Sequence, residues 1–131
     1  NASLKNDFRF FIKQKGALLA KGRILGIQFL ALFRDGLYFR LAKHANDMAS
    51  LLHRGIQDAG YAFFSESPSN QIFPILPNRL IQKLLQRFGF YIWKEIDSEH
   101  SAVRLVTSWA TEREMVLRFV DEVKSFINDS Y

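Results

Sequence analysis

A stripe of apolar residues recurs at steps of three and four along residues 38–59. This spacing puts the stripe on one face of a helix of about six turns, at 3.6 residues per turn. Gly60 follows directly and is expected to end that helix. The stripe predicts a core face made of Tyr38, Leu41, Ala42, Ala45, Met48, Ala49, Leu52, Ile56 and Ala59.

The segment before this stripe predicts two further helices. Phe8, Phe11 and Ile12 fit the face of a short helix that ends before Gly16. Residues 17–33 are apolar almost all round, and a helix of that kind is normally packed on every side. A lone domain of this size can hardly surround such a helix, so the pattern indicates a partner outside this chain.

The segment after the stripe predicts two strand pairs, each followed by a helix. The strands are expected at residues 61–65, 71–76, 90–96 and 102–107. Pro74 indicates that the second strand lies at an edge or ends early. Asn78 and a Thr111–Glu114 capping box are expected to begin the two helices. This order predicts an α/β (α+β) two-layer sandwich, with helices on one face of a small, mostly antiparallel sheet.

Composition limits the compartment and the class of protein. The chain has 131 residues, no cysteine and a formal net charge of +5. Its length fits a single domain over residues 1–131, with Asn1 and Ala2 also consistent with a cloning remnant. A chain without cysteine has no disulfide or thiolate site and suits the cytoplasm. The apolar run at residues 24–33 is too short for a membrane span, which needs about 20 apolar residues.

The histidines and carboxylates form no recognisable catalytic or metal-binding pattern. His44 and His53 lie on one predicted helix but not at the i, i+4 spacing of a metal pair, and His100 lies in a turn. A structural or solvated role is expected for all three. The sequence therefore predicts no catalytic residue and no metal ligand in this chain.

A cationic cluster near the start of the chain leaves three readings open. It consists of Lys13, Lys15, Lys21 and Arg23, close to several phenylalanines. Cations interleaved with aromatic rings can follow a nucleic-acid backbone and stack on its bases, so a small nucleic-acid-binding module is one alternative. A solvated basic edge is the favoured reading. The third is contact with a phosphate-bearing cofactor held by a neighbouring domain.

Arg104 is the one charged residue inside an otherwise apolar predicted strand. Alternation puts Arg104 on the same face as Val106 and opposite to Val103 and Leu105. An arginine there either faces solvent or is aimed at an anion, because its planar fork pairs a carboxylate through two parallel hydrogen bonds. From spacing alone, the solvent-facing reading is favoured.

Three stretches in order give the chain a resemblance to a known family. They are LLAKGRILGIQFLALFRDGL from Leu18, LAKHANDMASLL from Leu41 and VRLVTSWATE from Val103, joined by a short strand entry from Asn70. Together they resemble the C-terminal small domain of low-specificity threonine aldolases, in the β-eliminating lyase group. The resemblance implies the aspartate-aminotransferase fold type and the cofactor pyridoxal phosphate, and hence cleavage of β-hydroxy-α-amino acids such as threonine and allo-threonine to glycine and an aldehyde. Elimination or racemisation on the same fold is the neighbouring alternative.

The same resemblance implies what this chain supplies and what it lacks. Arg104 matches the family's arginine for the substrate α-carboxylate, and Lys21 is the nearest match to a basic residue beside the cofactor phosphate. The family's cofactor-attaching lysine belongs to an N-terminal large domain that precedes every residue here. We therefore expect the chain alone to be inactive, and the full-length protein to form homodimers or homotetramers.

Overall fold

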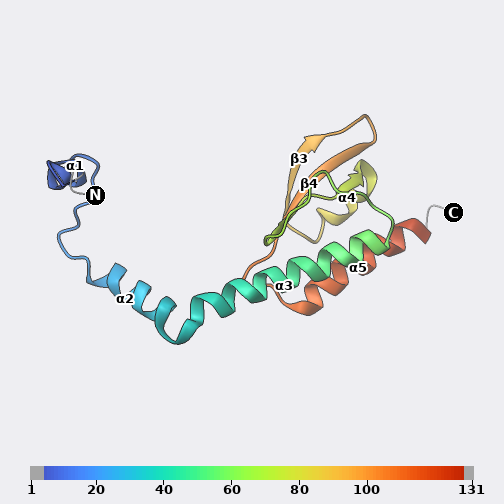
Figure 1. The fold of residues 1–131 in the computed structure, drawn as a ribbon. Coiled ribbons are helices and arrows are strands. Elements are labelled where there is room, and N and C mark those ends of the chain that lie inside the picture. Colours follow the sequence, from blue (N-terminus) through green and yellow to red (C-terminus); the bar gives the residue numbers. More distant parts are fainter. Residues whose placement is uncertain (1–4, 129–131) are drawn as a thin grey trace. The chain divides into compact units, whose positions relative to one another are not determined.

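The computed structural model describes residues 5–128, and the chain divides into two compact units, Asn1–Tyr38 and Phe39–Tyr131. The first unit contains α1 (Phe8–Gln14) and α2 (Arg23–Phe33), followed by a single 3-10 turn, η2 (Arg34–Gly36) (Figure 1). The predicted assignment of residues 1–131 to one domain of a longer enzyme stays a prediction.

None of the described residues of the first unit is buried. Seven large apolar side chains of α2 and its approach are about half exposed or more: Leu18, Leu19, Ile24, Ile27, Phe29, Leu30 and Phe33. Phe29 and Phe33 stack on each other with ring centroids 6.1 Å apart, and Phe33 also stacks on Tyr38. These ring contacts leave most of the apolar surface of α2 exposed, and the partner that the sequence pattern predicts for this helix stays a prediction.

The helix predicted over residues 17–33 begins later than expected. Gly16 ends α1 in the left-handed region, with φ at +68°, and its N–H bonds the carbonyl of Lys13. Helix α2 then begins at Arg23 with Gly22 as its N-cap. The prediction of helix for residues 17–22 was wrong because glycine is costly in a helix interior but accepted at a cap.

The second unit is built on α3 (Leu37–Asp58). The first two residues of this helix belong to the first unit. The predicted stripe is confirmed from its third turn onward, since the buried residues of α3 are Ala45, Met48, Ala49, Leu52 and Ile56. Gly60 ends the helix as predicted. Its φ is +86°, and the N–H groups of Gly60 and Tyr61 bond the carbonyls of Gln57 and Ile56.

The sheet of the second unit is organised around one strand. Strand β4 (His100–Val106) pairs on one edge with β1 (Gln71–Ile72) and β2 (Ile75–Pro77), and on the other with β3 (Tyr91–Glu95). Ala102 of β4 is paired with both Ile75 and Lys94, which places β2 and β3 on opposite edges. Every one of these pairings is antiparallel.

Two predicted strands differ in the structure. The strand expected over residues 71–76 is divided into β1 and β2 around Pro74, whose carbonyl still accepts the N–H of Val103. Proline cannot donate to a ladder, so the interruption has the cause that the sequence indicated. The strand expected at residues 61–65 is reduced to one bridge, Phe63 to Pro74, so the first predicted strand pair is not a hairpin of its own.

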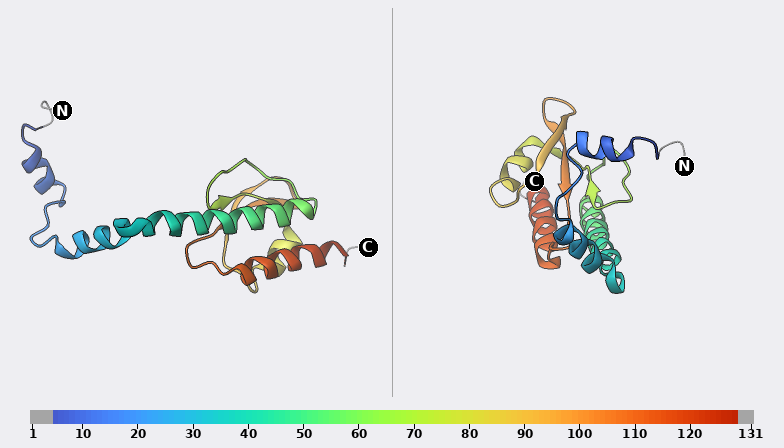
Figure 2. Two further views of the ribbon diagram at one scale, coloured as in Figure 1. Left: turned by 60° about the horizontal axis from the view of Figure 1, so that its bottom comes forward. Right: turned by 90° about the vertical axis from the view of Figure 1, so that its left-hand side faces the viewer.

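The helices of the second unit pack on one face of this sheet, which confirms the predicted fold class. Helices α3 and α5 (Arg113–Asn128) lie side by side, with the sheet and α4 (Asn78–Leu84) against them (Figures 1 and 2). One apolar cluster fills the space between, with Leu52 and Ile56 from α3, Leu76 from β2, Leu80, Ile81 and Leu84 from α4, Val103 and Leu105 from β4, and Val116, Phe119, Val120 and Val123 from α5.

Helix α5 begins one residue later than the capping box predicts. Its first helical residue is Arg113, and the Thr111 hydroxyl accepts a hydrogen bond from the Ser108 N–H instead. The Thr111 carbonyl lies 2.9 Å from Nε2 of His44, so this loop is tied to α3. The predicted apolar face of α5 is confirmed, since Val116, Phe119, Val120 and Val123 are all buried.

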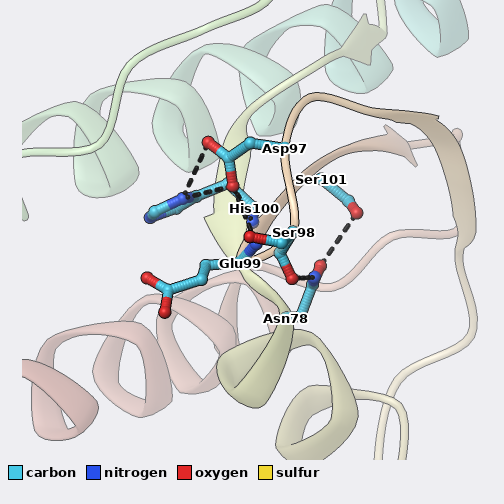
Figure 3. A network of polar contacts seen from close by, with 6 residues as sticks. All are labelled: Asn78, Asp97, Ser98, Glu99, His100 and Ser101. Atoms are coloured by element: carbon cyan, nitrogen blue, oxygen red, sulfur yellow. Dashed lines mark hydrogen bonds and ion pairs between the residues drawn. The ribbon is translucent and has the colours of Figure 1, made fainter.

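A polar network joins the β3–β4 turn to the start of α4 (Figure 3). The carboxylate of Asp97 accepts the N–H groups of Glu99 and His100, and Oδ1 lies 3.1 Å from Nδ1 of His100. The Asn78 side chain donates to the Ser98 carbonyl and accepts the Ser101 hydroxyl. Asn78 is the first residue of α4 rather than its cap as predicted, and the cap is Pro77. The two side-chain bonds of Asn78 fix the β3–β4 turn to that helix.

The pH dependence of this turn follows from Asp97. The backbone N–H of Glu99 and then the His100 side chain lower the pKa of the Asp97 carboxyl below its ordinary value of 3.8. Because the pKa of Asp97 is lower in the folded state, its ionised carboxylate stabilises the turn fully at a pH above the ordinary value. This stabilisation is lost as the pH falls through the folded-state pKa. We expect hydrogen exchange, followed by NMR from pH 6 to pH 2, to show the Glu99 and His100 amides losing protection before the Val103 amide does. Simultaneous loss at all three amides would contradict this role.

No helix in residues 5–128 is long and apolar enough to cross a membrane.

Candidate functional site

Arg104 lies on the face of the sheet that the helices leave uncovered. Its neighbours on β4, Val103 and Leu105, are 0% and 5% exposed and belong to the core, whereas Val106 is 54% exposed. Arg104 itself is half-buried. The predicted alternation is therefore confirmed, and the Arg104 side chain leaves the sheet on the side away from α3 and α5.

The end of β4 is held in place by Thr107, the residue that follows the strand. Thr107 is 4% exposed, and its hydroxyl donates to the carbonyl of Ala45 on α3 at 2.7 Å. The Asn70 side chain donates to the Thr107 carbonyl at 2.6 Å, and the Thr107 N–H returns a bond to the Asn70 carbonyl. These bonds anchor the strand that carries Arg104 to both the long helix and the entry of β1.

Two aromatic rings from β3 lie under the Arg104 guanidinium. Its central carbon, Cζ, lies 5.5 Å from the ring centroid of Tyr91 and 5.5 Å from that of Trp93. Tyr91 is the direct cross-strand partner of Arg104. The distances are within the range of a cation–π interaction, which is about 6 Å from the ring centroid.

An irregularity in β3 contributes to this arrangement. The register of β3 against β4 shifts between Ile92 and Lys94, so Trp93 has no single partner residue on β4. A bulge of this kind bends a strand locally and redirects a side chain. The Trp93 ring also packs on Phe73, with centroids 5.4 Å apart.

The Arg104 side chain has polar groups without partners in the described chain. Its Nε is shielded from solvent and makes no hydrogen bond, and no carboxylate of residues 5–128 forms an ion pair with it. A buried donor without a partner typically costs about 1–3 kcal/mol. A guanidinium with unsatisfied N–H groups on an open sheet face can bind an anion, and its planar fork fits a carboxylate through two parallel bonds.

Lys21 lies in the first unit, two residues before α2, and is exposed. Lys21 and Arg104 belong to different units, so their relation stays a prediction. The other members of the cationic cluster, Lys13, Lys15 and Arg23, are exposed as well. Exposure is equally expected of a solvated basic edge, so it does not favour the nucleic-acid alternative.

Each of the three histidines makes a structural contact within the chain. His44 bonds the Thr111 carbonyl, the His53 ring stacks on Phe63 at 3.9 Å, and His100 pairs with Asp97. No group of three histidine, aspartate or glutamate side chains in residues 5–128 is placed to hold a metal ion. A surface pocket of about 630 Å³ beside α5 is lined by Arg87, Arg118 and Glu122 among others, and Arg104 does not reach it.

Sequence reasoning missed the two rings beside Arg104. The alternation of residues 90–96 put Tyr91 and Trp93 on one face of a strand, and the turn at residues 97–100 implied a hairpin with the strand that carries Arg104. Those two signals together could have found Tyr91. The bulge that brings in Trp93 has no signature in the sequence.

Comparison with known proteins gives these features a context. The chain is 28% identical, over 129 residues, to the low specificity L-threonine aldolase of Pseudomonas sp. (strain NCIMB 10558), covering 98% of this chain and 36% of that enzyme. A solved structure of Leishmania major threonine aldolase matches 97% of this chain with a TM-score of 0.91 and 43% identity.

This chain is similar to threonine aldolases over nearly its whole length. The resemblance that the sequence predicted is confirmed, along with the mixed helix and antiparallel-sheet fold. The chain spans only 36–37% of the length of these two threonine aldolases. No family model matches the chain.

Two other solved structures share the fold of this chain. They are 8-amino-7-oxononanoate synthase from Francisella tularensis, with a TM-score of 0.60 and 10% identity over 82% of this chain, and serine palmitoyltransferase from Sphingomonas wittichii, with 0.53 and 22% over 63%. At such low identity these matches speak for the fold alone.

Proposed function

We propose that this chain is the C-terminal small domain of a pyridoxal-phosphate-dependent aldolase. The full-length enzyme cleaves β-hydroxy-α-amino acids, such as threonine and allo-threonine, to glycine and an aldehyde. The observation that carries this proposal is the match to Leishmania major threonine aldolase over 97% of the chain at 43% identity. The chain spans only about a third of its relatives' length, which agrees with an N-terminal large domain as the remainder of the enzyme in this proposal.

Arg104 binds the α-carboxylate of the substrate in this proposal. Three features support the role: its side chain leaves the open face of the sheet, its Nε has no partner, and Thr107 anchors its strand to α3. A guanidinium held by a fixed strand orients a carboxylate as well as attracting it, because both N–H bonds have defined directions. Orientation of this kind lowers the entropy cost of reaching the reactive geometry.

The cofactor itself would supply the electron sink for cleavage of the carbon–carbon bond. The lysine that attaches it lies in the large domain in the family, so the 131-residue chain alone is inactive in this proposal. Within the chain, Lys21 is the candidate for contact with the cofactor phosphate. Its exposure and its place before the Gly22 cap of α2 are compatible with that role.

The exposed apolar side chains of α1 and α2 bind the large domain or a second subunit in the full-length protein. Residues of the first unit such as Ile24, at 72% exposed, and Phe29, at 63%, would otherwise face water. Large exposed apolar patches usually mark an interaction site. We expect a homodimer or homotetramer in the cytoplasm, which agrees with a chain that has no cysteine.

The activity is tested with the full-length protein and added pyridoxal phosphate. We expect threonine to yield glycine and acetaldehyde in equal amounts, measured by amino-acid analysis and by enzymatic reduction of the acetaldehyde. Threonine racemisation, or elimination that releases ammonia, would replace the aldolase proposal by one of its relatives. The 131-residue chain assayed beside it should release no acetaldehyde.

The role of Lys21 is tested by cofactor retention. Lys21→Gln is expected to weaken binding of pyridoxal phosphate about tenfold, because a charge-assisted hydrogen bond is typically worth about 1.5–3 kcal/mol and part of it remains with the amide. Visible absorbance during dialysis measures retention directly, without a turnover assay. Lys13→Gln, on α1, is the matched control, and an unchanged affinity in Lys21→Gln would remove Lys21 from the site.

A further inference from the structure

We propose that Tyr91 and Trp93 are positioning residues, which hold the Arg104 guanidinium in the orientation that receives the substrate carboxylate. This inference rests on the proposed function of Arg104 and adds to it the two residues that determine how well that arginine works. Neither ring touches the reacting atoms in this proposal. Both act through Arg104.

The geometry is that of a cation resting on two rings. Cζ of Arg104 is equally distant, at 5.5 Å, from the ring centroids of Tyr91 and Trp93. Tyr91 lies directly across the antiparallel pair from Arg104, where cross-strand side chains meet. Trp93 lies at the bulge of β3 and has Phe73 against its ring. Two strands and a third ring therefore determine where the guanidinium rests.

No other interaction in the described chain fixes the Arg104 side chain. Its Nε makes no hydrogen bond, and no acidic side chain of residues 5–128 pairs with its guanidinium. The nearby cation on β3, Lys94, lies over a different ring, that of Phe64, at 5.3 Å. Lys94 therefore does not compete for the rings beneath Arg104.

Aromatic rings suit this task better than carboxylates would. A ring attracts the guanidinium through its face and leaves the in-plane N–H groups free, whereas a carboxylate would occupy the same N–H groups that a substrate needs. An arginine side chain has about 2 kcal/mol of rotamer entropy to lose on ordering. When the rings order it beforehand, less of that cost falls on substrate binding, which is the general advantage of preorganisation.

Two ligands that differ by a carboxylate provide the test. Glycine and methylamine both bear a primary amine, but only glycine can use Arg104. Their dissociation constants are measured on the full-length holoenzyme from the change in visible absorbance of the cofactor. We expect Trp93→Leu and Tyr91→Leu each to weaken glycine binding about 2- to 30-fold, the range of a cation–π contact, and to leave methylamine binding unchanged.

Conservative and control variants separate positioning from a loss of structure. Trp93→Phe and Tyr91→Phe keep a ring face and should restore most of the glycine affinity. Phe64→Leu removes the ring below Lys94 instead of those below Arg104 and should leave glycine binding unchanged. Trp93 and Tyr91 are 52% and 70% exposed, so their removal takes little from the core. Equal weakening of methylamine and glycine would overturn the proposal.

A double-mutant cycle distinguishes this inference from the function on which it rests. In an Arg104→Ala background, Trp93→Leu should have no further effect on glycine binding, because the ring acts only through the arginine. If Arg104→Ala alone leaves glycine binding unchanged, the proposed function of Arg104 fails. If Arg104→Ala weakens glycine binding while the Leu variants do not, the positioning role fails and the function of Arg104 stands.

Discussion

Replacement of Arg104 by alanine is expected to raise KM for threonine between about 100-fold and several thousand-fold, with a smaller change in kcat. Removing one partner of a desolvated ion pair typically costs about 3–5 kcal/mol, and each 1.4 kcal/mol corresponds to a factor of ten. The Arg104 guanidinium is already shielded at Nε and lies on two rings, so part of its desolvation precedes carboxylate binding. Steady-state kinetics of the full-length protein measure the effect.

Two variants define what the kinetics of Arg104→Ala mean. Arg104→Lys keeps the charge but loses the planar fork, so its KM should fall between those of the wild type and Arg104→Ala. Arg54→Ala removes an exposed arginine from α3 and should change neither constant. An Arg104→Ala enzyme with wild-type KM would exclude carboxylate binding by this residue.

The second large effect is expected at Gly55, where α3 and α5 approach each other closely. A β-carbon placed on Gly55 would come within 2.7 Å of Cγ1 of Val120 and closer still to Cγ2. Val120 is 6% exposed and β-branched, so its rotamer is restricted in a helix. Gly55→Ala should therefore force the helices apart and destabilise the fold by about 1–3 kcal/mol, despite the better helix propensity of alanine. Urea unfolding followed by circular dichroism measures the loss.

The same helix pair offers a rescue and a matched control. Val120→Ala removes the obstructing methyl groups, so the double variant Gly55→Ala/Val120→Ala should lose less stability than the two single losses added together. Gly26→Ala introduces the same methyl group into α2, where nothing lies within 4 Å of it, and should cause no loss. Additive losses in the double variant would show that the helices do not meet at this point.

The helices of the second unit were predictable because their periodicity extends over many residues. The stripe on α3 and the apolar face of α5 each contain enough positions at steps of three and four to place a helix. The failures were local. Residues 17–22 carry a helical pattern but are cut off by two glycines, and residues 61–65 have strand composition but only one bridging partner. The composition of a segment indicates which secondary structures it can adopt, whereas the residues that pack and pair with it determine which one forms.

The candidate site was predictable only in part, and for a definite reason. Alternation gave the face of Arg104 because the side chains of a strand have a period of two. The same rule could not give the position of Trp93 along β4, because the bulge after Ile92 shifts the register of β3 against β4. The role of Arg104 came from the family resemblance, since the residues of the strand alone favoured a solvent-facing arginine.

The central position of β4 has a consequence for how the protein is made. Strands β1, β2 and β3 pair with β4 and not with one another, and β4 ends at residue 106. No ladder of the sheet can therefore close while a ribosome is still synthesising the preceding residues, at about 5–20 residues per second. Once β4 emerges, the hairpin with β3 needs only a short loop, whereas the pairing of Gln71 with Val106 must close a much longer one. A nascent chain that stalls before residue 100 would expose α3 and its apolar face without a sheet to cover it.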